Sequence, residues 1–214
     1  MKILVVCPSR DRPKQLADMV RSCIQTAPEV DIAIYIDEDQ RRLYGWVEEE
    51  RTPKQLKVTF GLRIGPVASI NHLIQEYSGY DCYGFVLDDC RFGTLGWDKF
   101  LQGGGFRPPA VPWIVSPAKN TGDHGDMLFV SKAWMEALGW FAWPGCYHWG
   151  WDAIMSSLGH AAGVYYQANP KEFWITHDVL SSMNRDRYPA DIVQLYDFFS
   201  NYFQGALKQL KAAM

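Results

Sequence analysis

The feature that most constrains the fold is an alternation of short apolar runs and helical patterns in the first ninety residues. Ile3–Cys7 is a continuous apolar run rich in β-branched residues, which is typical of a strand buried on both faces. A helical pattern follows between Pro13 and Pro28. Further elements follow: strands over 31–36 and 83–87, and a helix over 69–77 between them. This order predicts an α/β fold with a mostly parallel central sheet flanked by helices.

The second half of the chain has a more mixed pattern. Ser131 is expected to cap a helix that ends at Gly139, and an amphipathic helix is expected from Ala190 onward. The remaining predicted elements are strands over 113–116, 127–130 and 173–176, and a helix over 151–158. No repeat or long linker divides the chain. We therefore expect one domain over residues 1–189, with the helix of residues 190–214 packed on its body.

Composition and charge exclude several classes of protein. Of the 214 residues, 48% are apolar, which is enough for a sizeable core, and the net charge of −3 gives no strong attraction to nucleic acid or an anionic membrane. The apolar runs are too short to span a bilayer or to form a signal peptide. The five cysteines contain no Cys-x-x-Cys pair. This pattern argues against a zinc cluster or disulfide framework and favours the reducing cytoplasm.

Polar clusters directly follow three of the predicted strands. They are Ser9-Arg10-Asp11-Arg12, Asp37-Glu38-Asp39 and Asp88-Asp89. In an open α/β sheet, ligands bind beyond the carboxyl ends of the strands. The clusters therefore predict a site at that edge, although polar residues also begin there simply because a buried strand has ended.

The residue types in these clusters are suited to a diphosphate and a cation. Arg10 and Arg12 can clamp a diphosphate through charge-assisted hydrogen bonds, and Asp37 can accept hydrogen bonds from a base or ribose. Asp88 and Asp89 repel each other unless a cation neutralises them, and Mg²⁺ or Mn²⁺ binds carboxylate and phosphate oxygens together. Neither G-x-G-x-x-G nor G-x-x-x-x-G-K-[ST] is present, which disfavours a dinucleotide site and a P-loop.

The ordered set of these motifs resembles a small GT-A fold glycosyltransferase of the large family 2-like group, a type common in bacteriophages. The resemblance extends over roughly residues 3–178. The matching segments are Val5–Pro13, Tyr35–Asp37, the stretch from Gly65 to Asn71-His72, Phe85–Asp89, Gly125–Val130 with Ala137–Phe141, Trp149–Asp152, and Thr176-His177.

The resemblance implies a role for each matching residue. Asp152 would be the catalytic base, and Asp89 and His177 would hold the metal. The nucleotide sugar would be bound by Ser9, Arg10, Arg12, Asp37, Asp39, Asn71 and Asp88. The acceptor would be bound by Trp149, Trp151, His124 and Asp126.

Some of these assignments have a structural alternative. The alternative for His177 is a structural role, since a lone histidine usually has one, and the alternative for Asp152 is to cap the helix that begins there. Cys90 stands where many members of the family carry another acid, and Trp151 replaces a common glutamate.

The resemblance implies transfer of a sugar from a nucleotide-diphosphate donor, with a UDP-sugar favoured, to an acceptor hydroxyl, assisted by Mn²⁺ or Mg²⁺. The acceptor is expected to be soluble: a saccharide, a small molecule or a hydroxymethylated base in DNA. The oligomeric state is left open. Two other functions stay open: a sugar nucleotidyltransferase, against which the missing glycine-rich loop counts, and a non-catalytic nucleotide- or carbohydrate-binding module.

Overall fold

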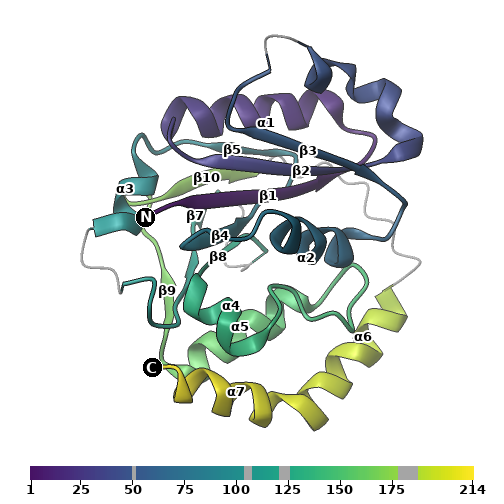
Figure 1. Cartoon of the computed structure of the whole chain (residues 1–214). Helices are drawn as coiled ribbons and strands as arrows, with labels where there is room; N and C mark the ends of the chain where they lie inside the picture. Colours follow the sequence, from purple (N-terminus) through teal and green to yellow (C-terminus); the bar gives the residue numbers. More distant parts are fainter. Residues whose placement is uncertain (50–51, 104–107, 121–125, 178–187) are drawn as a thin grey trace.

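The computed structural model describes residues 1–49, 52–103, 108–120, 126–177 and 188–214. Its centre is a seven-stranded sheet with the order β3-β2-β1-β4-β8-β6-β9, in which β8 runs antiparallel to its two neighbours (Figure 1). The strands of this sheet are β1 (Ile3–Ser9), β2 (Asp31–Asp37), β3 (Leu56–Gly61), β4 (Cys82–Phe85), β6 (Ile114–Ser116), β8 (Leu128–Ser131) and β9 (Tyr165–Gln167).

The side chains of strand β1 are buried on both faces of the sheet. Ile3, Val5 and Cys7 belong to the hydrophobic core on one face, whereas Leu4 and Val6 belong to the core on the other. Side chains alternate between faces along a strand, so a run with no polar position requires apolar layers on both sides.

Helices cover both faces of the sheet (Figure 1). On one face lies α1 (Pro13–Thr26), which buries Leu16 and Met19 against the strands. The 3₁₀ segment η1 (Glu38–Glu48) and α3 (Trp97–Gly103) contribute to the same core. The opposite face is covered by α2 (Pro66–Glu76), α4 (Lys132–Leu138) and α5 (Trp151–Ala162).

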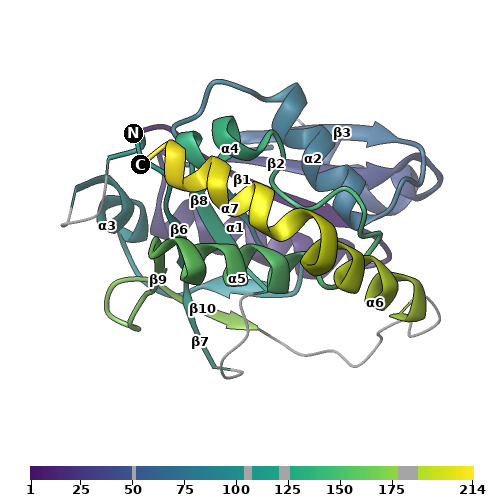
Figure 2. The same ribbon diagram turned by 90° about the horizontal axis from the view of Figure 1, so that it is seen from below.

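The C-terminal segment packs along the layer of α4 and α5 (Figure 2). It consists of α6 (Tyr188–Asp197), a π-helical turn (Phe198–Tyr202) and α7 (Phe203–Ala212). Phe198 and Leu210 are fully buried in the core of that face. Across the described ranges, no helix combines the length and the apolar character needed to cross a membrane.

A second, three-stranded sheet of order β5-β10-β7 lies beside the edge where β4 ends. Its strands are β5 (Cys90–Phe92), β7 (Ala118–Lys119) and β10 (Trp174–His177). Strand β10 pairs antiparallel with β5, so that His177 lies opposite Cys90. It pairs in parallel with β7, so that Ile175 lies opposite Lys119.

The predicted α/β class with a mostly parallel sheet is confirmed. Ser131 caps α4 by accepting a hydrogen bond from the Trp134 amide, and Gly139 ends that helix with φ of 76°. The sequence pattern predicts a strand over 173–176, which corresponds to β10, but it does not predict the second sheet. The strands of that sheet are only two to four residues long and are held by pairing with distant segments. Helix α2 begins at Pro66 rather than at residue 69, since proline is favoured in the first helical turn.

A glycine in β4 allows β4 and β8 to pack closely. A methyl group added at Gly84 would clash with the ring of Phe129 in β8, because three ring carbons would lie within 3.0 Å of it. We therefore predict that Gly84→Ala lowers the free energy of unfolding by about 1–3 kcal/mol through overpacking. Gly45→Ala is the matched control, because no atom lies within 4 Å of an added methyl group there. Equal stability of the two variants in urea unfolding would contradict this packing.

Candidate functional site

The three polar clusters are at one edge of the central sheet. Ser9 ends β1 and Asp37 ends the neighbouring parallel strand β2. Asp88 and Asp89 form the turn between β4 and β5, and β4 pairs with the other side of β1. The carboxyl ends of adjacent parallel strands meet at one edge, which explains why segments far apart in sequence converge.

Arg10 bonds to the acids at the end of β2. Its guanidinium donates to Asp37 Oδ2 at 2.6 Å, and to the two Asp39 carboxylate oxygens at 2.8 and 2.7 Å. These hydrogen bonds raise the pKa of Arg10 and, from the other side, lower the pKa of Asp39. Asp11, between the two arginines, has φ of 61°, a left-handed conformation that aspartate tolerates better than most residues.

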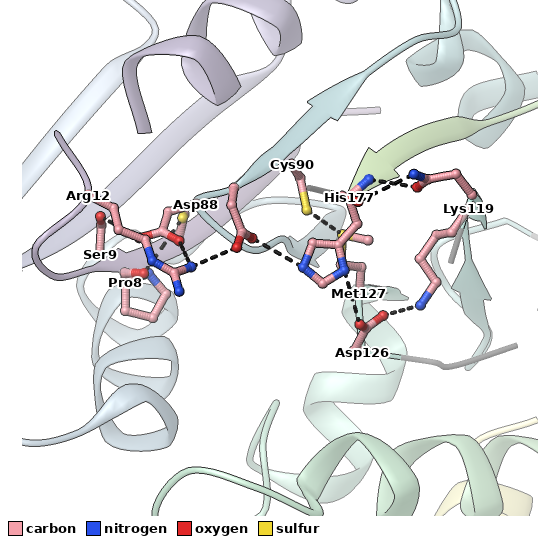
Figure 3. Close-up of polar contacts among 12 residues, drawn as sticks. Pro8, Ser9, Arg12, Asp88, Cys90, Lys119, Asp126, Met127 and His177 are labelled. Atoms are coloured by element: carbon pink, nitrogen blue, oxygen red, sulfur yellow. Dashed lines mark hydrogen bonds and ion pairs between the residues drawn. The ribbon is translucent and has the colours of Figure 1, made fainter. Parts of the chain in front are cut away.

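Arg12 bonds to the acids at the end of β4 (Figure 3). Its guanidinium donates to Asp88 Oδ1 at 3.1 Å and to Asp89 Oδ2 at 2.7 Å. Ser9 donates to Asp88 Oδ2 at 2.7 Å, and the Tyr44 hydroxyl lies 2.9 Å from the same serine oxygen. Burial raises the pKa of Asp88, whereas Ser9 and Arg12 act to lower it.

His177 contacts the other side of the Asp89 carboxylate. Its Nε2 lies 3.2 Å from Asp89 Oδ1, and the carboxylate raises the pKa of the imidazole. The backbone of His177 is held by Asn120, whose Oδ1 accepts from the His177 amide at 2.8 Å. Asp89 is thus bracketed by Arg12 and His177.

Three potential metal ligands meet at this point. Ligand atoms of Asp89, Cys90 and His177 all lie within 4.8 Å of one another. Asp89 is 6% exposed, and its Oδ1 is buried without accepting a hydrogen bond of good geometry. A buried carboxylate oxygen in that condition is costly unless a cation is bound, so these residues fit a metal ion.

A buried lysine and a further acid extend the site. The Lys119 ammonium is paired with Asp126, and its side chain is 2% exposed. Asp126 Oδ2 also lies 3.8 Å from His177 Nδ1 (Figure 3). The pKa of Asp152, the candidate base, is raised mainly by burial. The charge of Asp126 raises this pKa further, and the charge of Lys119 lowers it, each by less than burial does.

Asp152 lies in the first turn of α5, and the loop before it is held by the tail. Asp191 of α6 is 1% exposed and accepts three backbone hydrogen bonds from this loop. They come from the amides of Tyr147 at 2.7 Å, His148 at 3.1 Å and Trp149 at 3.0 Å. Gly150 then begins the helix in a left-handed conformation, with φ of 88°.

Two predicted site residues have other roles. Trp151, expected to bind the acceptor, is 4% exposed and packs edge-on against Phe85 with ring centroids 5.0 Å apart, so it belongs to the core. Asn71, expected to bind the nucleotide sugar, instead bonds to the backbone of the loop before α5, donating to the Ala142 carbonyl at 2.7 Å and accepting from the Phe141 amide. Core and loop packing engage these two side chains, and their predicted contacts with the acceptor and the nucleotide sugar stay predictions.

The remaining predicted residues are placed as follows. Trp149 is half-buried in the loop held by Asp191, and His124 lies outside the described residues. The polar contacts described above form two groups at this edge of the sheet. The first is Arg10, Asp37 and Asp39. The second is Ser9, Arg12, Asp88, Asp89, Asp126 and His177.

Sequence reasoning missed four polar residues. Tyr44, Lys119 and Asn120 belong to no motif, and their roles depend on pairings between segments far apart in the chain. Asp191 had a detectable signal, because it is an acid at the start of an otherwise apolar helical stripe. Acids are common in first helical turns, so the residue type alone does not indicate that Asp191 holds a loop.

Comparison with known proteins identifies the fold. No protein-family model and no curated sequence matches the chain. The crystal structure of S. aureus TarS 1–349 matches with a TM-score of 0.65 and 12% identity, over 100% of this chain and 71% of that one. The mannosyltransferase PcManGT from Pyrobaculum calidifontis, solved with GDP-Man and Mn²⁺, matches with a TM-score of 0.65 and 14% identity, over 99% and 73%.

GalNAc-T7, solved with UDP, GalNAc and Mn²⁺, matches with a TM-score of 0.72 and 11% identity, over 95% of this chain and 49% of that one. The chain likewise spans 43% of the longer TarS structure. At such identities the likeness establishes the fold, which is the GT-A fold of glycosyltransferases.

The three hydrogen bonds to Asp191 make a prediction about the loop before α5. Asp191→Ala leaves three backbone amides without their acceptor and is expected to lower the free energy of unfolding by about 1–3 kcal/mol. Hydrogen exchange at these amides should accelerate, whereas Asp191→Asn, which retains one acceptor oxygen, should have a smaller effect. Asp197→Ala is the control on the same tail, because Asp197 bonds only to the exposed Asn201 side chain among the described hydrogen bonds. Unchanged exchange in Asp191→Ala would show that the loop is held by other contacts.

Proposed function

We propose that this chain is a glycosyltransferase that moves a sugar from a nucleotide-diphosphate donor, a UDP-sugar being favoured, to an acceptor hydroxyl with the help of a divalent cation. One observation carries the proposal. On a GT-A fold, ion pairs join the loop after β1 to the acids that follow β2 and β4, and Asp89 Oδ1, the carboxylate oxygen nearest to His177, is buried without a hydrogen bond of good geometry.

The residues at the ends of β1 and β2 are suited to the nucleotide. Asp37 is 9% exposed at the end of β2 and can accept hydrogen bonds from a base or ribose. Arg10, already oriented by Asp37 and Asp39, presents a planar guanidinium beside them. Arginine in such a position recognises phosphate oxygens through paired hydrogen bonds.

Asp89 and His177 would hold the cation, with Asp88 and Arg12 beside them. A divalent cation bound there would neutralise the charge that develops on the departing diphosphate. Arg12 holds Asp89 Oδ2, which leaves Oδ1 directed toward His177. The role of Arg12 is therefore to orient the carboxylate and to supply positive charge next to the phosphates.

Asp152 is the proposed general base that removes the proton from the acceptor hydroxyl. Its raised pKa, caused mainly by burial, makes it a stronger base than an exposed aspartate. The backbone amide of Ala153 stabilises its charged form, so the carboxylate can still serve as a base at neutral pH. The N-cap of α5 is Gly150, and Asp152 lies inside the first turn, where a carboxylate also interacts favourably with the helix dipole.

We propose a soluble acceptor, either a saccharide or a hydroxymethylated base in DNA, and a role in the cytoplasm, which for a bacteriophage protein is that of the host. Asp126 and the half-buried Trp149 are the acceptor-side candidates. An aromatic face suits either a sugar ring or an extruded base.

The donor site is tested by binding a panel of UDP- and GDP-sugars, each with and without a divalent cation, by calorimetry. We expect cation-dependent binding of one nucleotide class, and strong weakening of that dependence in Asp89→Asn. Asp18→Asn is the control, because Asp18 pairs with Arg21 and Arg91 on the surface. If no panel member binds, or if Asp89→Asn retains the full cation dependence, the proposed donor site is wrong.

Asp152→Asn is expected to leave donor binding unchanged and to reduce transfer by about 10²–10⁴-fold, because the base is lost. In the wild-type protein, kcat/KM should fall as the pH drops through the raised pKa of Asp152, because only the deprotonated carboxylate can act as a base. This fall should be centred at a pH above 3.8, the ordinary pKa of an aspartate. The variant should lack this fall.

A stability measurement separates catalysis from capping. Because folding raises the pKa of Asp152, its carboxylate destabilises the fold above that pKa, and the penalty disappears below the unfolded-state pKa. Asp152→Asn should therefore raise the melting temperature at neutral pH while transfer falls. Asp98→Asn, a buried acid in the first turn of α3, is the matched control and should retain transfer. A near-normal rate of transfer in Asp152→Asn would show that Asp152 has only a structural role.

A further inference from the structure

The residue after the two carboxylates is a cysteine that faces the same point as His177. Antiparallel pairing of β5 with β10 places Cys90 directly opposite His177. Directly opposed residues in an antiparallel pair project their side chains from the same face of the sheet, with Cβ atoms about 4.5–5.5 Å apart. The backbone therefore brings a thiol, an imidazole and the preceding Asp89 carboxylate to one location.

The distance between the oxygen and the nitrogen fits two ligands of one ion. Asp89 Oδ1 and His177 Nε2 are 3.2 Å apart. Two ligands about 2.1 Å from a shared cation, at angles between octahedral and tetrahedral, are separated by about 3.0–3.4 Å. The Cys90 sulfur lies within 4.8 Å of a ligand atom of Asp89 and of one of His177, so the three side chains surround a common point.

The sulfur environment points to the chemical class of the cation. Cys90 is 1% exposed, and its Sγ lies 3.1 Å from the thioether sulfur of Met127, which is fully buried. Magnesium and manganese prefer oxygen ligands, whereas thiolate and imidazole favour zinc and cobalt. Three protein ligands with an open fourth position are the arrangement of catalytic zinc sites.

We infer that Cys90 is the third protein ligand of the cation site, and that the site selects a borderline cation such as Zn²⁺ over Mg²⁺ or Mn²⁺. This inference rests on the proposed function for the identity of the fourth ligand, a diphosphate oxygen. On binding, the thiol transfers its proton to solvent and coordinates as thiolate, because a bound metal ion deprotonates a coordinating thiol. The site is distinct from a structural zinc cluster, since it combines single oxygen, nitrogen and sulfur ligands from two paired strands and the turn before them.

The test uses Co²⁺ as a spectroscopic substitute for Zn²⁺. The full-length protein is stripped with a chelator and titrated with Co²⁺ alone. We expect a near-ultraviolet sulfur-to-cobalt charge-transfer band that saturates at one equivalent and is removed by Zn²⁺. Saturable Co²⁺ binding without this band in the wild-type protein would overturn the inference, and this result needs no variant.

Two substitutions assign the band to one thiol. Cys90→Ser should abolish it and weaken Zn²⁺ binding by about 100-fold or more, since a thiolate ligand is lost. Cys23→Ser is the matched control, because Cys23 is buried in α1 and belongs to no group of potential ligands in the described chain. A band that survives Cys90→Ser, or disappears in Cys23→Ser, would assign the sulfur ligand to another residue and refute the proposal.

Competition between cations measures the selectivity. Wild-type protein should bind Zn²⁺ more tightly than Mn²⁺ by about 100-fold or more, and Cys90→Ser should narrow this ratio. A ratio that is the same in both proteins would show that the sulfur does not set the preference. Failure of the proposed function has a different signature: the charge-transfer band appears, but no nucleotide sugar binds to the metal-loaded protein.

Discussion

Two adjacent carboxylates, Asp88 and Asp89, are buried at the end of β4, and the arrangement of the site depends on neutralising them. Burying an unpaired charge is expensive, and two of one sign are worse. The fold brings donors to the pair from three directions: the serine that ends β1, Arg12 in the loop that follows it, and His177 at the end of β10. The second sheet is therefore part of the site, since its pairing delivers the imidazole.

The tail helix is connected to the same site through the backbone. Asp191 accepts hydrogen bonds from three consecutive amides, so its carboxylate occupies the place that a bound anion takes at a ligand-binding loop or a helix N-terminus. A buried carboxylate with three amide donors is well satisfied, so it fixes the loop that leads into α5. The position of Asp152 thus depends on α6, which contributes no other polar group to the site in the described structure. The tail therefore stabilises the loop that leads into α5.

The sequence predicted those parts of the molecule that local pattern determines. Strand β1 is apolar at successive positions, so both faces of the sheet must be covered by other elements. The polar residues after β1, β2 and β4 lie at one edge because these parallel strands end there. It could not reveal the three-stranded sheet, whose short strands are stable only through pairing with remote segments. For the same reason Lys119 and Asn120 escaped notice, and Trp151 was assigned to the acceptor although its ring packs on Phe85. Residue type alone does not distinguish an aromatic ring in a site from one in the core.

The charge balance of the site explains why a cation fits it. The ion pairs described at the site form two groups. One joins Arg10 to Asp11, Asp37 and Asp39. The other joins Arg12, Lys119 and His177 to Asp88, Asp89 and Asp126. Around the candidate cation site, three carboxylates face two permanently cationic groups and the imidazole of His177, so the local charge balances only while His177 carries a proton. A divalent ion that replaces a proton on His177 adds one net positive charge beside Asp89 Oδ1, a buried oxygen that makes no hydrogen bond of good geometry. The same acids that make the metal-free site costly to bury therefore give the cation its affinity.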